Sequence, residues 1–250
     1  MKKVILSIAI FFSAFGMIAR NVADTNKVDA KGLKVGLWKE KNNQIDWYGH
    51  YENGLKTGSW TGYYSNGIIS NIEEYKNGKK NGVSVMIDKT GFVYQTDSYT
   101  NDTLNGICSS YSSGGRLKSK IEYKMGKING MKKIYYTEGT IQEEGTFKND
   151  LRDGTTKWYY QEGSVSVLYN YKDGNLEGMQ KTFYKNGNTN SEVFMKNNLE
   201  EGEYKEYTEF GKLKITGKYV KGKKEGAWKE FDEEGKVIKT EQYKNGELKK

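Results

Sequence analysis

Large apolar side chains recur along this chain at fixed distances from a repeated glycine. Eight glycines are spaced 24 residues apart and mark eight units, in which each position is counted from the marker glycine. Position 5 is large and apolar in every unit, and position 17 is Tyr, Phe or Met. A period of this length along a whole chain indicates a repeat architecture rather than a single catalytic motif. The marker glycines, interpreted as structural turn residues, are Gly58, Gly82, Gly106, Gly130, Gly154, Gly178, Gly202 and Gly226.

Two turn signals in each unit predict a pair of short strands. Position 9 is Gly in all eight units, and position 20 is Gly, Asp or Asn. These turns leave two strands of about six or seven residues per unit, an ordinary strand length. We expect a tight hairpin turn at Ser65–Ile68 and a longer hairpin loop over Lys76–Gly82. Gly36 opens a shorter unit of 22 residues, so the chain holds about nine units.

The fold class that this pattern predicts is all-β, an elongated antiparallel β-meander of about nine 24-residue hairpin repeats. About eighteen strands spaced by roughly 4.8 Å would form a sheet on the order of 85 Å long. One unit is too small to fold alone, so its stability must come from stacking on its neighbours. At position 20, Gly is replaced only by Asp102, Asp150 and Asn198. Because Asp and Asn tolerate left-handed backbone, we expect a positive φ at this position in every unit.

Composition narrows the fold class further. Hydrophobic residues make up 35% of the chain and the mean hydropathy is −0.86, which is too polar for a thick two-layered core. Aromatic residues reach 14%, which argues against a disordered chain. The chain has 30 Gly and no Pro, so its many turns depend on positive φ at Gly and Asn. Aromatic residues combined with glycine turns favour β-structure.

The N-terminus differs from the rest of the chain. Residues 4–19 form an apolar run after a basic start, which predicts a secretory signal peptide over residues 1–23. Cleavage after Ala19 or Ala23 fits the small-residue rule, and an uncleaved anchor is the alternative. No Cys directly follows the run, so we expect no lipoprotein anchor. We therefore expect an exported protein, in the periplasm, on the outer surface or secreted, with a short linker at residues 24–35 and a repeat domain at 36–250.

Candidate catalytic residues are few. His50 is the single His and Cys108 the single Cys, and neither lies in a pattern that a triad or a zinc site requires. Carboxylate pairs such as Glu73 and Glu74 alternate with Lys, which is typical of a solvated sheet surface. The net charge of +8 is spread over mixed charges, so nucleic-acid binding is not expected. We predict no enzymatic activity, no metal or other cofactor and no small-molecule substrate.

Four aromatic residues form the candidate binding patch. Positions 5 and 17 are aromatic or apolar in every unit, so we interpret them as the packing core. Position 6 should point to the opposite face from position 5, and position 4 shares its side. This reasoning predicts a partner-binding patch, although the same face could instead pack because the sheet curls. Lysines at position 3 should point to the same face as position 5, which conflicts with an apolar core on that face. The sequence alone does not resolve this conflict. The patch residues are Tyr136, Trp158, Tyr160 and Tyr184.

The repeated phrase resembles the bacterial variant of the MORN repeat. It is written YENGLKTGSWTGYYSNG over Tyr51–Gly67 and YVKGKKEGAWKEFDEEG over Tyr219–Gly235. The resemblance covers essentially everything after the expected signal peptide, although Trp at position 2 is replaced in the middle units. It implies a stack of β-hairpins without catalysis, and bacterial members are often labelled antitoxins. Lipid binding is associated with the more distant eukaryotic form.

The function expected from these patterns is that of an exported, non-enzymatic repeat protein that presents an extended sheet face to a partner. A protein partner is expected first, because a long regular face with mixed charge and aromatic residues suits a large surface. Cell-envelope glycan or lipid headgroups are alternative ligands. An antitoxin or immunity protein that neutralises a toxin is the alternative function.

Overall fold

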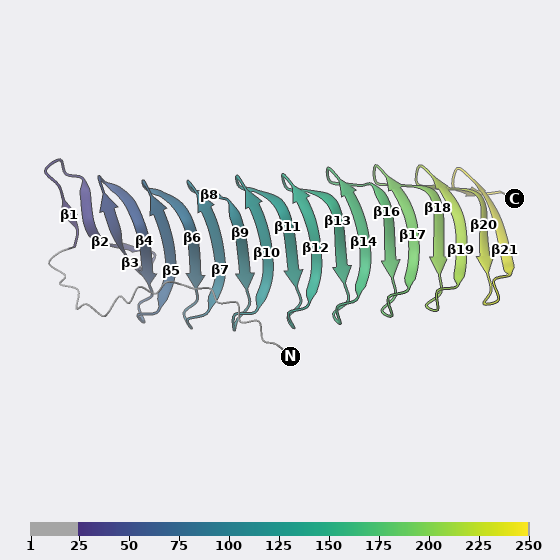
Figure 1. Cartoon of the computed structure of the whole chain (residues 1–250), viewed down its shortest axis with the longest axis horizontal. Coiled ribbons are helices and arrows are strands. Elements are labelled where there is room, and N and C mark those ends of the chain that lie inside the picture. Colours follow the sequence, from purple (N-terminus) through teal and green to yellow (C-terminus); the bar gives the residue numbers. More distant parts are fainter. Residues whose placement is uncertain (1–24, 250) are drawn as a thin grey trace.

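The computed structural model describes residues 25–249, and every regular element in this range is a β-strand (Figure 1). Strands that follow one another in sequence pair antiparallel, so the sheet is one open meander whose strands run across the long axis. This confirms the predicted all-β fold class. The predicted signal peptide lies outside the described residues. Residues 27–28, inside the expected linker, form a short strand against Lys34 and Val35.

Of the 22 strands between residues 25 and 249, eighteen have six or more residues, and most have eight or nine rather than the expected six or seven. Their bounds are β1 Lys27–Val28, β2 Lys34–Asn42, β3 Ile45–Glu52, β4 Leu55–Tyr63, β5 Ile69–Lys76, β6 Lys79–Ile87, β7 Val93–Thr100, β8 Thr103–Leu104, β9 Gly106–Tyr111, β10 Leu117–Lys124, β11 Lys127–Tyr135, β12 Ile141–Lys148, β13 Leu151–Tyr159, β14 Val165–Lys172, β15 Asn175–Leu176, β16 Gly178–Phe183, β17 Thr189–Lys196, β18 Leu199–Tyr207, β19 Leu213–Val220, β20 Lys223–Phe231, β21 Val237–Lys244 and β22 Glu247–Leu248.

The two kinds of hairpin connection are the reverse of those predicted. β5 and β6 are joined by only two residues, Asn77 and Gly78, with φ of 50° and 79°. Two positive φ values define a type I′ turn, which matches the twist of the flanking strands. The longer connection is the five residues 64–68, where the Tyr64 amide donates to the Ile68 carbonyl at 2.8 Å. The prediction was wrong because Ser65–Asn66–Gly67 supplies a positive φ only at its glycine.

Position 20 has a positive φ in all eight units, as predicted. Its backbone N–H also joins neighbouring units: the Asp102 amide donates to the Lys80 carbonyl at 2.9 Å. Where Asp or Asn replaces Gly, the side chain adds a second bond. Asp102 Oδ1 accepts from the Lys80 amide at 2.7 Å, and Asp150 Oδ1 accepts from the Ile128 amide at the same distance. The substitutions therefore respect the turn and strengthen the contact between units.

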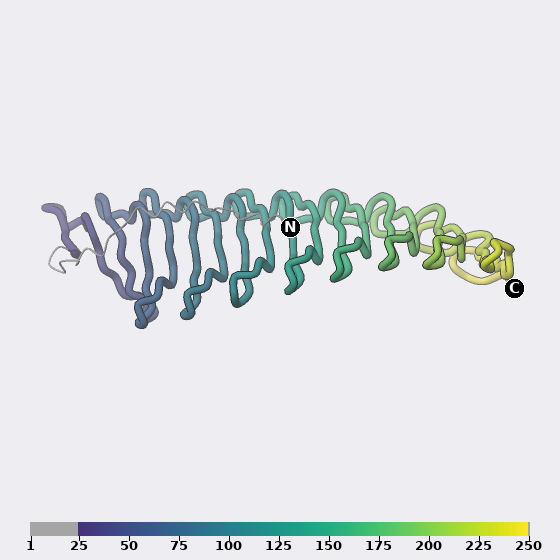
Figure 2. Tube along the Cα trace, turned by 60° about the horizontal axis from the view of Figure 1, so that its bottom comes forward, coloured from purple at the N-terminus to yellow at the C-terminus, as the bar shows by residue number. Residues whose placement is uncertain are grey.

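The core of this one-layered sheet is a line of side chains along one face. Hairpins follow one another along the long axis, with connections at both long edges (Figure 2). Six of the eight position-2 side chains are buried, and the indole of Trp60 is 0% exposed. Position 2 therefore forms the most buried row of the described chain. Its buried members are Trp60, Ser84, Cys108, Thr156, Gln180 and Trp228.

The predicted packing core at positions 5 and 17 is divided between the two faces. Side chains alternate along β4, so Trp60 and Tyr63 point to opposite sides. On the side opposite to Trp60, position 5 joins polar contacts: the Tyr159 hydroxyl donates to Glu144 Oε1 at 2.5 Å. Glu144 Oε2 also pairs with Lys133 at 3.0 Å. Lysines at position 3 and aromatic residues at position 5 thus lie on the same face, where a glutamate binds both. This explains why charged and aromatic residues alternate in step along these strands.

Candidate functional site

One face of the sheet carries a row of aromatic rings with cations above them, which we call the aromatic–cation face. Tyr75, at position 17, pairs across the strands with the marker glycine Gly58, so both lie on the same side of the sheet. Because side chains alternate along a strand, the residues two before and two after each marker glycine also point to this side. The rings are Trp38, Tyr51, Trp60, Tyr75, Tyr99, Phe147, Trp158, Tyr169, Tyr171, Tyr204, Tyr219, Trp228 and Tyr243, and the cations are Lys34, Lys56, Lys80, Lys132, Arg152 and Lys224.

The rings pack edge to face along the N-terminal part of the row. The ring centroids of Trp38 and Tyr51 lie 5.4 Å apart, and those of Tyr51 and Trp60 lie 5.2 Å apart. Tyr75 continues the row at 6.3 Å from Trp60. Edge-to-face contacts place the positive ring edge against the negative ring face of the neighbour. Side chains of one layer thus bury Trp60 without a second sheet.

A cation lies over most of these rings. Lys56 Nζ is 3.8 Å from the centroid of Trp60, and Lys34 Nζ is 4.4 Å from that of Trp38. In the middle of the chain, the Arg152 guanidinium lies 5.2 Å from Trp158. Lys224 Nζ is 4.1 Å from Trp228. The negative ring faces attract these cations, and the aliphatic stems cover ring surface that water would otherwise reach.

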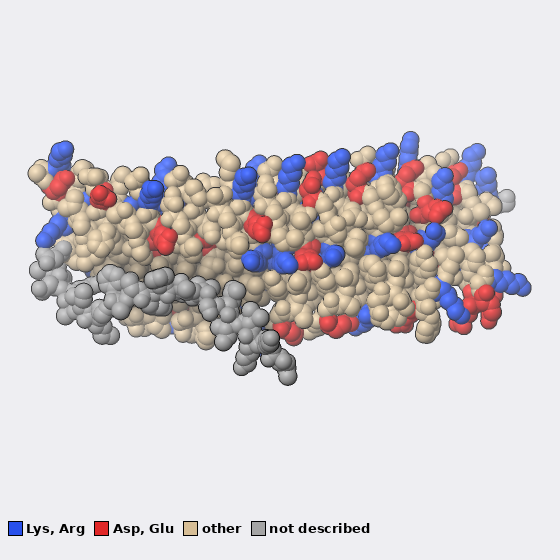
Figure 3. Space-filling model, in the orientation of Figure 1, with Lys and Arg blue, Asp and Glu red and all other residues tan. Residues whose placement is uncertain are grey.

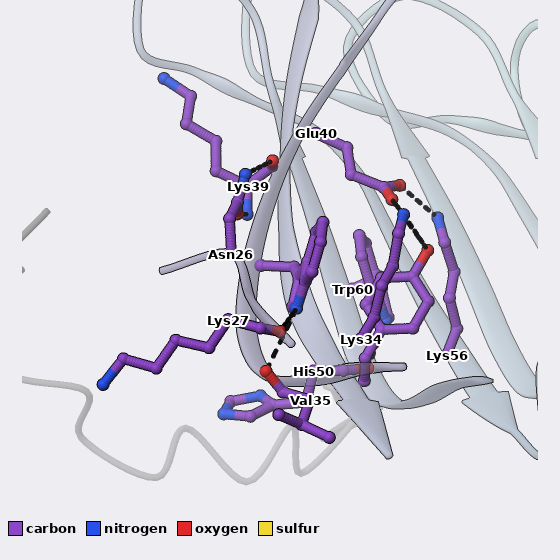
Figure 4. A network of polar contacts seen from close by, with 11 residues as sticks. Asn26, Lys27, Lys34, Val35, Lys39, Glu40, His50, Lys56 and Trp60 are labelled. Carbon is purple, nitrogen blue, oxygen red and sulfur yellow. Dashed lines mark hydrogen bonds and ion pairs between the residues drawn. The ribbon is translucent and has the colours of Figure 1, made fainter. Parts of the chain in front are cut away.

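Carboxylates hold most of the cations in place. Glu40 accepts from Lys34 at 2.8 Å and from Lys56 at 3.1 Å, so it bridges two cations of the row (Figure 4). Its Oε1 also accepts from the Tyr51 hydroxyl at 2.8 Å. Partial burial raises the pKa of Glu40, but hydrogen bonds from Lys34, Tyr51 and Lys56 outweigh burial and lower it to about 2. Glu40 is therefore a permanent anion at neutral pH.

Two further carboxylates repeat this arrangement along the face. Glu73 Oε1 lies 2.7 Å from Lys80 Nζ, and its Oε2 accepts from the Tyr75 hydroxyl at 2.7 Å. Glu143 Oε1 lies 2.6 Å from the Arg152 guanidinium. These side chains are between 11% and 28% exposed, so their ion pairs are only partly screened by solvent. The face is thus a half-buried lattice of rings and ion pairs.

The groups with catalytic potential have inert surroundings. Cys108 is 8% exposed, and desolvation raises the pKa of its thiol to about 11, which keeps it protonated. His50 is exposed on β3, and its carbonyl accepts from the Trp60 indole at 3.2 Å. Within residues 25–249 no three His, Cys, Asp or Glu side chains are placed to hold a metal ion. In the same part of the chain, no helix has the length and apolar character needed to cross a membrane.

The four residues of the predicted patch take two different roles in packing. The Tyr136 hydroxyl donates to the Tyr159 carbonyl, and the Tyr160 hydroxyl donates to the Phe183 carbonyl, both at 2.7 Å. Tyr184 makes the same bond to the next unit at 2.8 Å. Trp158 instead packs on Tyr169 with centroids 5.7 Å apart and lies on the aromatic–cation face. All four side chains are half-buried, and their partner-binding role stays a prediction.

The sequence interpretation missed the glycines beneath position 2. A Cβ atom on Gly49 would overlap the indole of Trp60, and one on Gly217 would overlap that of Trp228. Gly145 lies in the same way under Thr156, whose Oγ1 would be 2.6 Å from such an atom. Each glycine precedes the side chain above it by 11 residues, a spacing that the sequence already contains.

Charged side chains dominate one long edge of the molecule. Lys and Arg side chains line the upper edge in Figure 3, with Asp and Glu among them. Exposed lysines flank many of the two-residue turns, as at Lys76 and Lys79 around Asn77–Gly78. The edge is therefore basic but mixed, in contrast to the ring-filled interior of the aromatic–cation face.

An open sheet of stacked hairpins, packed by side chains of its own single layer, defines the class of β-hairpin repeat proteins. Six segments match the family model described as the MORN repeat variant: residues 56–77, 128–149, 152–173, 176–197, 200–221 and 224–245. These segments cover more than half of the 250 residues, so the chain belongs to the MORN repeat variant family. No curated protein matches the chain. Residues 78–127, between the first two matched segments, form the same antiparallel hairpins.

Proposed function

We propose that this chain is an exported, non-enzymatic repeat protein that binds a protein partner through its aromatic–cation face. The observation that carries this proposal is the row of cations over aromatic rings, which extends from Lys34 to Tyr243 along one side of the sheet. Tyr, Trp and Arg are the residue types that contribute most binding energy at protein interfaces. A face that presents them at a regular spacing suits a long partner surface.

The exposure of the face supports binding at its outer layer. The rings form the base, and the ammonium groups and carboxylates above them remain accessible: the side chain of Lys34 is 39% exposed and that of Glu40 is 26% exposed. Because each cation is already positioned by a ring and a carboxylate, a partner would bind to polar groups that are ordered in advance. Preorganised groups lose little conformational entropy on binding.

The proposed absence of catalysis rests on the surroundings of the few reactive groups. Cys108, whose pKa is raised to about 11 by desolvation, would be a poor nucleophile at neutral pH. His50 is exposed, and its partners on the two neighbouring strands are Leu37 and Thr57, neither of which is an acid or a base. The family to which the chain belongs is one of repeats, and repeats of this kind are generally scaffolds for binding.

A capture experiment with matched variants tests the binding proposal. The full chain is immobilised and exposed to cell-envelope extract, and retained proteins are identified by mass spectrometry. We expect Trp158→Ser and Lys80→Gln to reduce capture at least tenfold, and Phe210→Ser, on an 84% exposed loop side chain, to leave it unchanged. Circular dichroism and melting curves check that each variant folds. Equal capture by folded Trp158→Ser and Lys80→Gln variants would refute the proposed face.

Export is tested separately. Fractionation of cells that produce the native chain should place it outside the cytoplasm, and N-terminal sequencing should begin after Ala19 or Ala23. Recovery of the intact chain only from the cytoplasm would overturn the exported location. The identity of a captured protein then separates a general binding role from the antitoxin alternative, because only a toxin partner supports the latter.

A further inference from the structure

The face opposite to the aromatic–cation face carries a line of lysines, which we call the lysine row. Position 3 is Lys in the last five units, and cross-strand pairing places these lysines in line with position 14 of the neighbouring strands. Glu144, for example, faces both Lys133 and Lys157. A row of mainly basic side chains crosses the middle of the C-terminal half in Figure 3. From β10 to β21 the lysine row consists of Lys120, Lys133, Glu144, Lys157, Leu168, Lys181, Glu192, Lys205, Thr216, Lys229 and Thr240.

The carboxylates of this face neutralise only part of the lysine row. Glu144 and Glu192 each lie 3.0 Å from one lysine of the row. Lys229 lies between two threonines, and Lys120 directly faces Lys133, a like-charge pair that is unfavourable by itself. With the adjacent line toward the two-residue turns included, seven lysines lie among four glutamates, so this part of the face is basic. The charges that the adjacent line adds are Lys218, Glu122 and Glu203.

A line of aromatic rings, which we call the ring row, runs parallel to the lysine row on the same face. Position 5 lies two residues beyond position 3 on the same strand, about 7 Å away, and points to the same side. The cross-strand partners of these rings are uncharged, as Val165 is for Tyr159 and Thr189 is for Phe183. The rings are half-buried, so part of each remains accessible. From β9 to β20 the ring row consists of Tyr111, Tyr135, Tyr159, Phe183, Tyr207 and Phe231.

The spacing of the two rows defines the shape of a ligand that would follow both. From Lys133 to Lys229 a lysine and a ring recur at every second long strand, at intervals of about 9.6 Å along the molecule. A matching ligand is a linear chain with anionic groups along one side and apolar ring faces along the other. Sugar rings have apolar C–H faces that pack on aromatic rings, uronate sugars carry a carboxylate, and an extended disaccharide has about the length of this interval.

We propose that this face binds a linear acidic polysaccharide along the long axis of the sheet, with the lysine row on its carboxylates and the ring row on its sugar rings. The inference goes beyond the proposed function, because it concerns the opposite face and another class of ligand. Single-stranded nucleic acid fits less well, because it carries a phosphate at every nucleotide and would place some phosphates against Glu144 and Glu192. Its bases stack on successive aromatic rings, whereas side chains such as Val165 separate the rings here.

The test uses polygalacturonate, a linear chain of uronate sugars, and its fully methyl-esterified form, which has the same backbone without the charges. The full chain is immobilised, and binding is measured by biolayer interferometry. We expect saturable binding of polygalacturonate and none of the ester. A triple variant with Lys120→Gln, Lys157→Gln and Lys229→Gln should bind about tenfold more weakly, because three exposed or half-buried ion pairs with the ligand are lost. A double variant with Tyr135→Leu and Phe231→Leu should also bind more weakly, since it keeps apolar side chains but removes two rings.

The matched control is a triple variant with Lys76→Gln, Lys79→Gln and Lys89→Gln, which changes the net charge equally at exposed lysines outside the lysine row. It should bind polygalacturonate as wild type does, and circular dichroism and melting curves check that every variant folds. Equal binding by wild type and the lysine-row variant, or equal loss in the control, would overturn the proposed surface. Tighter binding of polyglutamate or of single-stranded oligothymidylate than of polygalacturonate would overturn the assignment to a polysaccharide.

Discussion

The indole ring of Trp60 lies directly over Gly49, in the space that a Cβ atom on Gly49 would occupy. The ring is completely buried there, although the sheet has a single layer. Gly217 and Trp228 repeat the arrangement 168 residues further along the chain. Tryptophan at position 2 can therefore lie flat on the sheet only where the facing residue has no side chain.

Gly49→Ala is expected to destabilise the protein by about 1–3 kcal/mol, since the added methyl group must displace a buried indole. The φ of Gly49 is not in the left-handed region, so alanine introduces steric overlap without backbone strain. Chemical denaturation monitored by tryptophan fluorescence measures the loss. Ser59→Ala, an exposed neighbour of Trp60 on β4, is the control and should change stability little. Equal stability of Gly49→Ala and wild type would show that the ring can move aside.

The fold could be predicted from the sequence because the turn residues show where each strand ends. Glycines at a period of 24 locate every hairpin, and Asp102, Asp150 and Asn198 replace Gly only where left-handed backbone is tolerated. The lengths of the two hairpin connections in each unit were exchanged: the turn expected to be tight has five residues, and the loop expected to be long has two. Asn77 adopts a positive φ next to Gly78, and nothing in the sequence alone distinguishes this Asn-Gly pair from the one at Asn66–Gly67. The decisive factor is the pairing of Lys76 with Lys79, which is a property of the folded sheet.

The aromatic–cation face was less accessible to sequence reasoning than the fold. Position 17 was recognised as a packing position, but position 5 was assigned to the same core although it lies on the opposite side. Strand parity alone could not assign it, because charged residues are present on both faces. Lys133 shares a face with Tyr135, and Glu144 on the next strand pairs with that lysine. Side-chain contacts between neighbouring strands, rather than the alternation within one strand, show which face a residue helps to pack.

Glu40 should make stability depend on pH in the acid range. Its folded-state pKa is lowered to about 2 from an ordinary value of 4.5, so the carboxylate stabilises the fold fully above pH 4.5. This contribution is lost as the pH falls from 4.5 through 2, because protonation ends the ion pairs with Lys34 and Lys56. Glu40→Gln should therefore be less stable than wild type at pH 7, and the difference should shrink toward pH 2. A difference that is independent of pH in urea titrations between pH 2 and 7 would contradict this role.

Asp102→Gly tests the side-chain bond between neighbouring units. Glycine accepts the φ of 65° at this position, but it removes the acceptor of the Lys80 amide. We expect a loss of about 0.5–1.5 kcal/mol from the missing hydrogen bond and faster hydrogen exchange at the Lys80 amide. The Lys56 amide, whose corresponding turn residue is Gly78, serves as an internal reference and should exchange as before. Unchanged exchange at Lys80 would mean that water replaces the carboxylate without cost.

Tyr160→Phe separates the structural role of the predicted patch from its binding role. The variant keeps the ring but removes the hydroxyl that donates to the Phe183 carbonyl of the next unit. That carbonyl would lose one hydrogen-bond donor, so we expect the free energy of unfolding to fall by about 1 kcal/mol. Partner capture should persist in both Tyr160→Phe and Tyr160→Ser, because Tyr160 lies outside the proposed aromatic–cation face. Tyr160→Ser should lose more stability than Tyr160→Phe, since it also removes the half-buried ring. Loss of capture by a folded Tyr160→Ser variant would instead show that the predicted patch contributes to partner binding.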